Sequence, residues 1–337
     1  MITPKTLAEF KESVSVNLIS DLDSDYEDSN SNLKVQLIES NVLTIPQIDG
    51  FSEWRQLNDT KHWYVSSVGE KYVVLNKMND RVWAAYSLMS VDDFSKVSKS
   101  WIRNTINLDN CWISVSQMQR IGKEMGWSEH GIGIKYVDSL STDVYPSKVS
   151  IKAWYGNNRV IDRLLEEAKD NFSINSIRLK SPKHKAPASS EWYSSGKITF
   201  HSAEDINDII YCVSKISNDY NDELKHVTKL RDSEKGSFEF SFKQNVCLDQ
   251  YSDAVSKGKT DLQLWMMETE SSKDFKRFQG VDMHTWDRIF LDMGDRYAYM
   301  TIPGKGCVNA APRLVAVQGE KIMGKTSVYY NGSEVFA

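Results

Sequence analysis

Two acids and a histidine stand close together near the C-terminal end of the sequence, where they could hold a divalent metal ion. Asp282 and His284 are separated by one residue, and Asp287 follows after two more. On a strand, residues two apart point to the same side, so this carboxylate and this imidazole could bind one ion. A metal-dependent hydrolase or nuclease using Asp282, His284 and Asp287 is therefore one hypothesis. The competing interpretation is an ordinary hairpin with exposed acids, which we favour, so we expect no metal and no cofactor.

A thiol lies a short distance further along the chain. Cys307 belongs to the stretch IPGKGCVNAAP (302–312), whose glycines match neither the P-loop nor the dinucleotide-binding motif. A nucleophilic cysteine needs a neighbouring base, and the sequence does not indicate one. We therefore interpret this stretch as a tight turn, and we lean toward a protein that is not an enzyme.

A basic segment in the middle of the chain could bind phosphate groups. Four cations lie within eight residues with no acid among them, and a fifth follows on the next predicted strand. Cations at this density hold the phosphates of nucleic acids. An aromatic ring on an earlier predicted strand could stack on a base. The candidate nucleic-acid contacts are Arg178, Lys180, Lys183, Lys185, Lys197 and Trp154. The alternative interpretation is a solvated hairpin tip.

The elements around this segment follow a regular order. Apolar and β-branched runs predict strands at 149–156, 174–180, 196–200 and 237–243. Helices are predicted after Asn157 or Asn158 and after Ser202, because apolar residues at helical spacing follow in both places. The resulting βαββαβ order is that of a ferredoxin-like module, with two helices on one face of a four-stranded antiparallel sheet.

Residues 149–243 resemble an RNA-recognition motif. The most specific part is GKITFHSAEDINDII (196–210), which is similar to the third strand, turn and second helix of that family. Aligning Phe200 with the last aromatic of the family's RNP1 motif places Ser195 and Lys197 where stacking rings usually stand, a departure from the family pattern. The resemblance implies contact with RNA or single-stranded nucleic acid.

The flanking regions complete an α+β protein. Thr6 and Glu9 predict a capped N-terminal helix with one apolar face, followed by an acidic linker. A β-meander at 62–89 and helices at 90–104 and 114–126 form an N-terminal α+β region. Five further strands are predicted at 262–270, 285–293, 297–302, 313–317 and 327–330. We predict four segments, at 1–32, 33–140, 148–244 and 245–337, the last a β-rich domain or an extension of the middle sheet.

Composition narrows the function classes. The chain has 337 residues and a formal net charge of −5, which argues against a generic polyanion binder but allows a local basic patch. No apolar run is long enough for a membrane span, and we expect no membrane partner. Four scattered cysteines indicate thiols in a reducing cytoplasm. We expect a non-enzymatic binding protein that contacts RNA or single-stranded nucleic acid. An assembly protein that binds a partner through its N-terminal helix is the further alternative.

Overall fold

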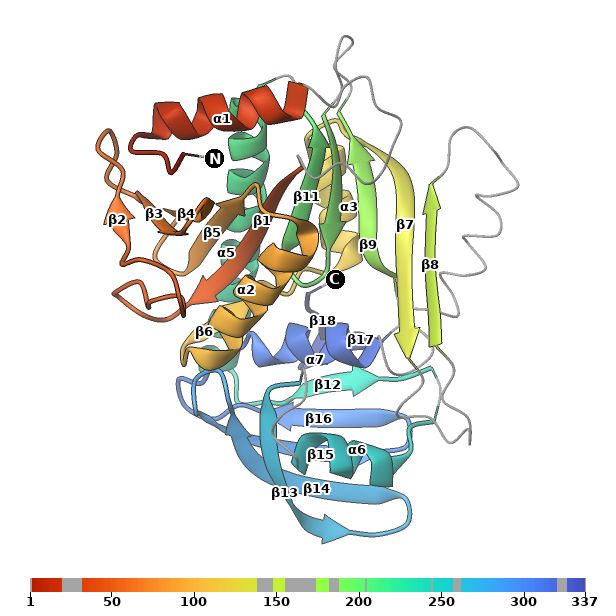
Figure 1. Cartoon of the computed structure of the whole chain (residues 1–337). Coiled ribbons are helices and arrows are strands. Elements are labelled where there is room, and N and C mark those ends of the chain that lie inside the picture. The colour runs from red at the N-terminus through yellow and green to blue at the C-terminus, as the bar shows by residue number, and fades with distance from the viewer. Residues whose placement is uncertain are drawn as a thin grey trace. The chain divides into compact units, whose positions relative to one another are not determined.

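Figure 1 shows the computed structural model, which has the α+β class that the sequence predicts. It describes residues 2–19, 32–137, 148–154, 174–181, 188–203, 205–243, 245–256, 262–319 and 326–336. The chain divides into two compact units, each assembled from separate stretches. The first unit comprises Met1–Cys111, Met118–Glu129 and Arg178–Asn221; the second comprises Trp112–Gln117, His130–Ile177 and Asp222–Ala337.

An antiparallel sheet forms the first unit, with strand order β2-β3-β4-β5-β1-β11-β10 followed by the end of β9, and with β6 paired to the end of β1. Its strands are β1 (Leu33–Ser40), β2 (Arg55–Gln56), β3 (Trp63–Val68), β4 (Lys71–Lys77), β5 (Val82–Ser87), β6 (Leu108–Asn110), β9 (Ile174–Lys180), β10 (Ser189–Tyr193) and β11 (Lys197–Ser202). The strands β3 to β5 confirm the predicted meander. Gly69 at the β3–β4 turn has a φ of 56°, a backbone conformation that glycine adopts at little cost.

Helices cover both faces of this sheet. On one face lie α1 (Leu7–Ile19) and α5 (Ile206–Ser233), linked by a hydrogen bond from Lys11 Nζ to Asn207 Oδ1 of 2.8 Å. The ring of Phe10 in α1 packs edge-on against Tyr86 of β5 at 6.0 Å between centroids. On the opposite face lies α2 (Val91–Asn104), whose Phe94 shares a buried cluster with Ile38 of β1. We call this second side the α2 face.

The N-terminal helix uses its apolar side within its own unit. The predicted cap is confirmed, since the backbone N–H of Glu9 donates to Thr6 Oγ1 at 3.1 Å. Phe10 and Val14 are fully buried and Leu18 is 1 % exposed. Intramolecular packing therefore covers this apolar side, and the protein partner expected at the N-terminal helix stays a prediction.

The helix predicted after Ser114 is also present, as α3 (Val115–Glu124), with the Gln117 N–H capped by Ser114 Oγ at 3.0 Å. It is joined to α5 by two ion pairs, Arg120 to Asp219 at 2.6 Å and Lys215 to Glu124 at 2.8 Å. Helix α3 therefore lies on the same side of the sheet as α5, opposite α2.

The second unit contains a seven-stranded antiparallel sheet in the order β13-β14-β15-β16-β12-β17-β18, together with the antiparallel pair β7 (Ser128–Val137) and β8 (Lys148–Trp154). The sheet strands are β12 (Phe238–Ser241), β13 (Leu264–Ser271), β14 (Phe275–Asp282), β15 (Arg288–Gly294), β16 (Tyr297–Thr301), β17 (Ser327–Tyr330) and β18 (Ser333–Glu334). Helices α6 (Leu248–Ser256) and α7 (Ala310–Gly319) pack on one face, since Asp249 of α6 pairs with Lys276 and Arg313 of α7 pairs with Asp282.

The predicted ferredoxin-like module is not confirmed. Its expected fourth strand, β12, pairs with β16 and β17 in the seven-stranded sheet, so both edges of this strand are occupied there. The strand at 196–200, β11, pairs with β1 and β10 instead. The helix predicted after Asn157 lies outside the described residues, as does the acidic linker at 20–31. Strands are present at the four predicted places, as β8, β9, β11 and β12, but β10 stands between β9 and β11, and the pairing partners come from distant parts of the sequence.

One predicted strand is a helix. Residues 313–317 lie within α7, where Leu314 and Val317 are buried. A short apolar run fits a buried helix as well as a buried strand, and Pro312 is tolerated because it stands in the first helical turn. Within the described ranges, none of the helices combines the length and apolar character that crossing a membrane requires.

Candidate functional site

Strand alternation decides where the basic segment points. Leu179 of β9 packs against Gly122 of α3 so closely that a Cβ on Gly122 would lie 2.8 Å from Leu179 Cδ1. Leu179 therefore faces the α3 side of the sheet. Because neighbouring side chains on a strand alternate between faces, Arg178 and Lys180 point to the α2 face. Arg178 Nε donates to Ser189 Oγ there at 3.3 Å.

Lys197 lies on the same face. It stands opposite Gln36 of β1, on the side where Ile38 meets α2. Its Nζ donates to Ser95 Oγ of α2 at 3.3 Å and lies 5.2 Å from the centroid of the Tyr193 ring. Burial, and then the Glu191 carboxylate, raise the pKa of Tyr193, so the ring stays neutral beside the cation.

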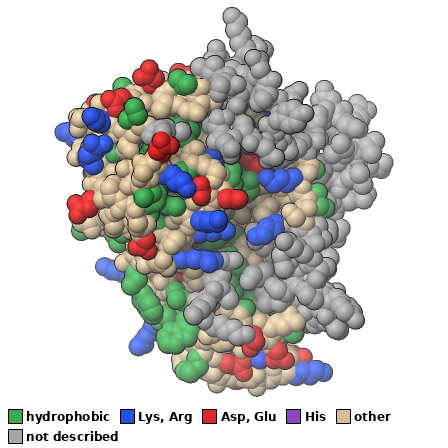
Figure 2. All heavy atoms as spheres, viewed as in Figure 1, with side chains coloured by type: hydrophobic (Ala, Val, Ile, Leu, Met, Phe, Trp, Pro, Cys, Tyr) green, Lys and Arg blue, Asp and Glu red, His purple; other side chains and the backbone are tan. Residues whose placement is uncertain are grey.

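Helix α2 adds three cations that the sequence analysis did not select. Lys96, Lys99 and Arg103 are exposed at spacings of three and four residues, which places them along one side of the helix. Figure 2 shows Lys and Arg side chains gathered in the middle of the view, over α2 and the strands beside it. We call this surface the basic face. Its residues are Lys96, Lys99, Arg103, Arg178, Lys180 and Lys197.

The other predicted nucleic-acid contacts cannot be placed on this face. Lys183 and Lys185 lie outside the described residues, and of Trp154 only the backbone, in β8, is described. Phe200, which aligns with the last aromatic of RNP1, is fully buried. Its neighbour Ile198 stands opposite Val35 and is also buried, so this side of β11 faces the helix α1 side of the core.

The acids proposed for metal chemistry occupy a buried turn in the second unit. Asp282 and His284 are each 1 % exposed, so the expectation of exposed acids is wrong for this pair. Asp282 is the last residue of β14 and points to the helix-covered face. Its Oδ1 accepts hydrogen bonds from the His284 backbone N–H at 3.0 Å and from Arg313 Nη2 at 2.5 Å. This carboxylate therefore neutralises a buried guanidinium and holds the turn.

The three residues of the metal hypothesis do not converge on one point. Asp287 contributes its backbone carbonyl, which accepts the Asp282 N–H at 2.8 Å and closes the turn. Among the described residues, neither Asp282 nor Asp287 belongs to a group of three side chains that could hold an ion. The hydrolase hypothesis built on Asp282, His284 and Asp287 thus finds no support in their geometry.

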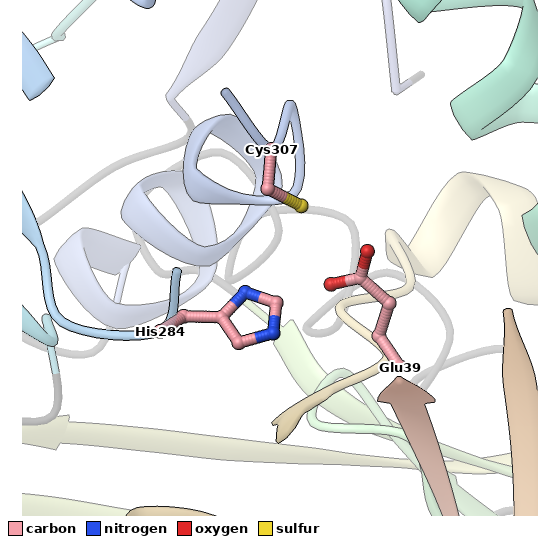
Figure 3. A group of neighbouring side chains, drawn as sticks. All are labelled: Glu39, His284 and Cys307. Carbon is pink, nitrogen blue, oxygen red and sulfur yellow. The ribbon is translucent and has the colours of Figure 1, made fainter. Parts of the chain in front are cut away.

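His284 instead has a thiol as its neighbour. A ring nitrogen of His284 and Sγ of Cys307 lie within 4.8 Å of each other. Figure 3 shows the two side chains pointing into the same space, His284 from the turn after β14 and Cys307 from the segment before α7; Glu39, also drawn, is on β1 of the first unit. The two loops approach closely because Gly306 has no side chain: a Cβ there would lie 3.3 Å from Asp287 Cβ.

The face of the seven-stranded sheet opposite α6 and α7 carries exposed apolar side chains. Trp265 and Met267 of β13 are 57 % and 63 % exposed, and Phe290 of β15 is 39 % exposed. In the register of the strands, Trp265, Val281 and Arg288 form one row, and Met267, Gln279 and Phe290 form the next. These six side chains line a pocket of about 850 Å³, together with residues of α6. In Figure 2, hydrophobic side chains gather in the corresponding lower part of the view.

Comparison with known proteins identifies the family of this two-unit α+β chain. The model of the MJECL33-like protein family matches residues 5–319, so the chain belongs to this family. No curated protein and no solved structure matches the chain.

Proposed function

We propose that the first unit binds single-stranded nucleic acid through the basic face. The observation behind this proposal is that cations from three elements share one side of a sheet: Arg178 and Lys180 from β9, Lys197 from β11, and the exposed cations of α2. The net charge of the whole chain is −5, so such a concentration of positive charge is a local feature. Phosphates are the anions that a row of flexible lysines and arginines suits best.

The binding would rest on phosphate contacts rather than on stacking. Each cation that neutralises a phosphate of a single strand contributes about −0.7 to the slope of log affinity against log salt. Six contacts give a slope near −4, which corresponds to about a 300-fold loss of affinity between 50 and 200 mM salt. Base identity would have little effect, because base edges are read by other groups.

The test compares two charge reversals of equal size. The variant Lys96→Glu/Lys99→Glu changes the basic face; the control Lys5→Glu/Lys123→Glu changes exposed lysines associated with α1 and α3, on the opposite side. Affinity for a labelled oligouridine of about 20 nucleotides is measured by fluorescence anisotropy over a salt series. We expect the first variant to bind at least tenfold more weakly, with a slope reduced by about 1.4, and the control to bind much as the unchanged protein does.

Two results contradict the proposal. One is equal weakening by both variants, which would indicate a response to net charge alone. The other is undetectable binding of the oligonucleotide by the unchanged protein at 50 mM salt. Both variants alter exposed side chains, so their thermal unfolding should match that of the unchanged protein and serves as the control for folding.

Cytoplasmic location is part of the same proposal. None of the four cysteines forms a disulfide, and three of them are buried. Buried thiols of this kind support a reducing compartment, where single-stranded RNA is also found.

A further inference from the structure

The thiol and the imidazole of the second unit are two metal-ligating groups held at ligand spacing. Cys307 is 7 % exposed and His284 is 1 % exposed. Bonds from a first-row d10 ion are about 2.3 Å to sulfur and about 2.0 Å to nitrogen. An ion on the line between two such donors would therefore separate them by about 4.3 Å, which is within the 4.8 Å limit on the Sγ to nitrogen distance.

The segments that carry His284 and Cys307 are both held in place by hydrogen bonds. The His284 backbone N–H bonds to Asp282, whose carboxylate is itself held by the buried Arg313 of α7. Cys307 is followed by the turn that starts α7, where the Ala311 N–H donates to the Val308 carbonyl at 3.1 Å. Arg313 thus links the turn of His284 to the helix that follows Cys307. Two ligands anchored in this way lose little freedom on binding an ion.

Charge distinguishes between kinds of ion. A thiolate carries one negative charge, and a neutral imidazole carries none. A monovalent cation bound to both gives a neutral complex, whereas a divalent cation leaves a net positive charge between two buried side chains. Asp282 offers no further compensation, because it is already paired with Arg313. Soft thiolate ligands also favour Cu(I), which is stable with only two ligands.

We propose that Cys307 and His284 bind a monovalent thiophilic cation of the Cu(I) class in linear two-coordinate geometry. The thiol proton is released on binding, so binding strengthens as the pH rises. This site belongs to the second unit and is independent of the nucleic-acid proposal for the first. It also departs from the expectation of no metal that the sequence alone suggested.

The test titrates Cu(I) into the full-length, reduced protein without oxygen, in competition with a chromophoric Cu(I) chelator. One ion should bind per chain. Cys307→Ser and His284→Gln should each weaken this binding at least tenfold, while Cys247→Ser, which changes a half-buried thiol elsewhere, should not. X-ray absorption of the bound ion should show one sulfur and one nitrogen ligand.

Three results overturn the proposal. Binding that survives in Cys307→Ser places the ion elsewhere. Failure of the unchanged protein to compete with the chelator excludes the site. A coordination number of three or more, or Zn²⁺ binding tighter than that of Cu(I) and lost in the same variants, replaces it with a different kind of site. Because the serine variant keeps the size of the side chain, its thermal melt separates loss of binding from loss of fold.

Discussion

The buried ion pair between Asp282 and Arg313 gives the sharpest test of how the second unit is held together. The two side chains are 1 % and 0 % exposed, and Nη2 lies 2.5 Å from Oδ1. Replacing Arg313 with Met keeps most of the side-chain volume but leaves the carboxylate buried without its cation. Removing one partner of such a pair costs about 3–5 kcal/mol. At about 2–4 °C per kcal/mol for a unit of this size, the melting temperature should fall by about 6–20 °C.

A second variant tests whether the unpaired carboxylate of Asp282 causes this loss of stability. In Asp282→Asn/Arg313→Met neither charge remains, while the asparagine oxygen can still accept the His284 N–H. We expect this double variant to be less destabilised than Arg313→Met alone, by at least about 1.5 kcal/mol. Urea unfolding followed by circular dichroism measures both free energies. If Arg313→Met lies within about 1 kcal/mol of the unchanged protein, or if the double variant is the less stable of the two, the reasoning is refuted.

Three further outcomes are expected. Hydrogen bonding to Lys276 holds the pKa of Glu268 below its usual value of 4.5. The ionised Glu268 therefore contributes its full stabilisation above pH 4.5, and this contribution is lost as the pH falls through the lowered pKa. In Lys276→Met, the free energy of unfolding measured with urea should accordingly fall less steeply toward acid pH. Burial, and then a neighbouring carboxylate, raise the pKa of Cys111 well above the usual value. A thiol reagent at pH 8 should therefore react fastest with Cys247. If this fast reaction persists in Cys247→Ser, the prediction is contradicted. Gly306→Ala should destabilise the protein by about 1–3 kcal/mol, because its Cβ would lie 2.6 Å from Ile302 Cγ2; an unchanged thermal melt would disprove it.

Local signals predicted much of the first unit. The helix α2 was predictable from Ser90, whose Oγ accepts the Asp93 N–H at 3.1 Å, and from its apolar periodicity. The strand β14 was missed because its inward positions include Lys276. That lysine is buried only because Asp249 and Glu268 neutralise it, and two of these three residues lie on other elements. A pattern of hydrophobic alternation cannot reveal such a strand.

The candidate sites, too, could be predicted from the sequence only where their residues are close together in the chain. Arg178, Lys180 and Lys197 could be selected from local charge density, and Lys96 and Lys99 could have been added from their spacing on a predicted helix. The sequence could not place Cys307 beside His284, because 22 residues and two strands separate them. Their proximity depends on a hairpin register and on the missing side chain of Gly306.

The pairing of β1 with β11 has a consequence for synthesis on the ribosome. Leu33 stands opposite Phe200, so the strand that pairs with one edge of β1 is synthesised more than 150 residues later. At about 5–20 residues per second, β1 is complete roughly 8–30 s before β11 is. During that interval the nascent chain has β5 to pair with one edge of β1, while the edge next to Leu33 and Val35 stays open to other chains. Newly made chains are therefore the form of this protein in which chaperone binding or aggregation should centre on β1.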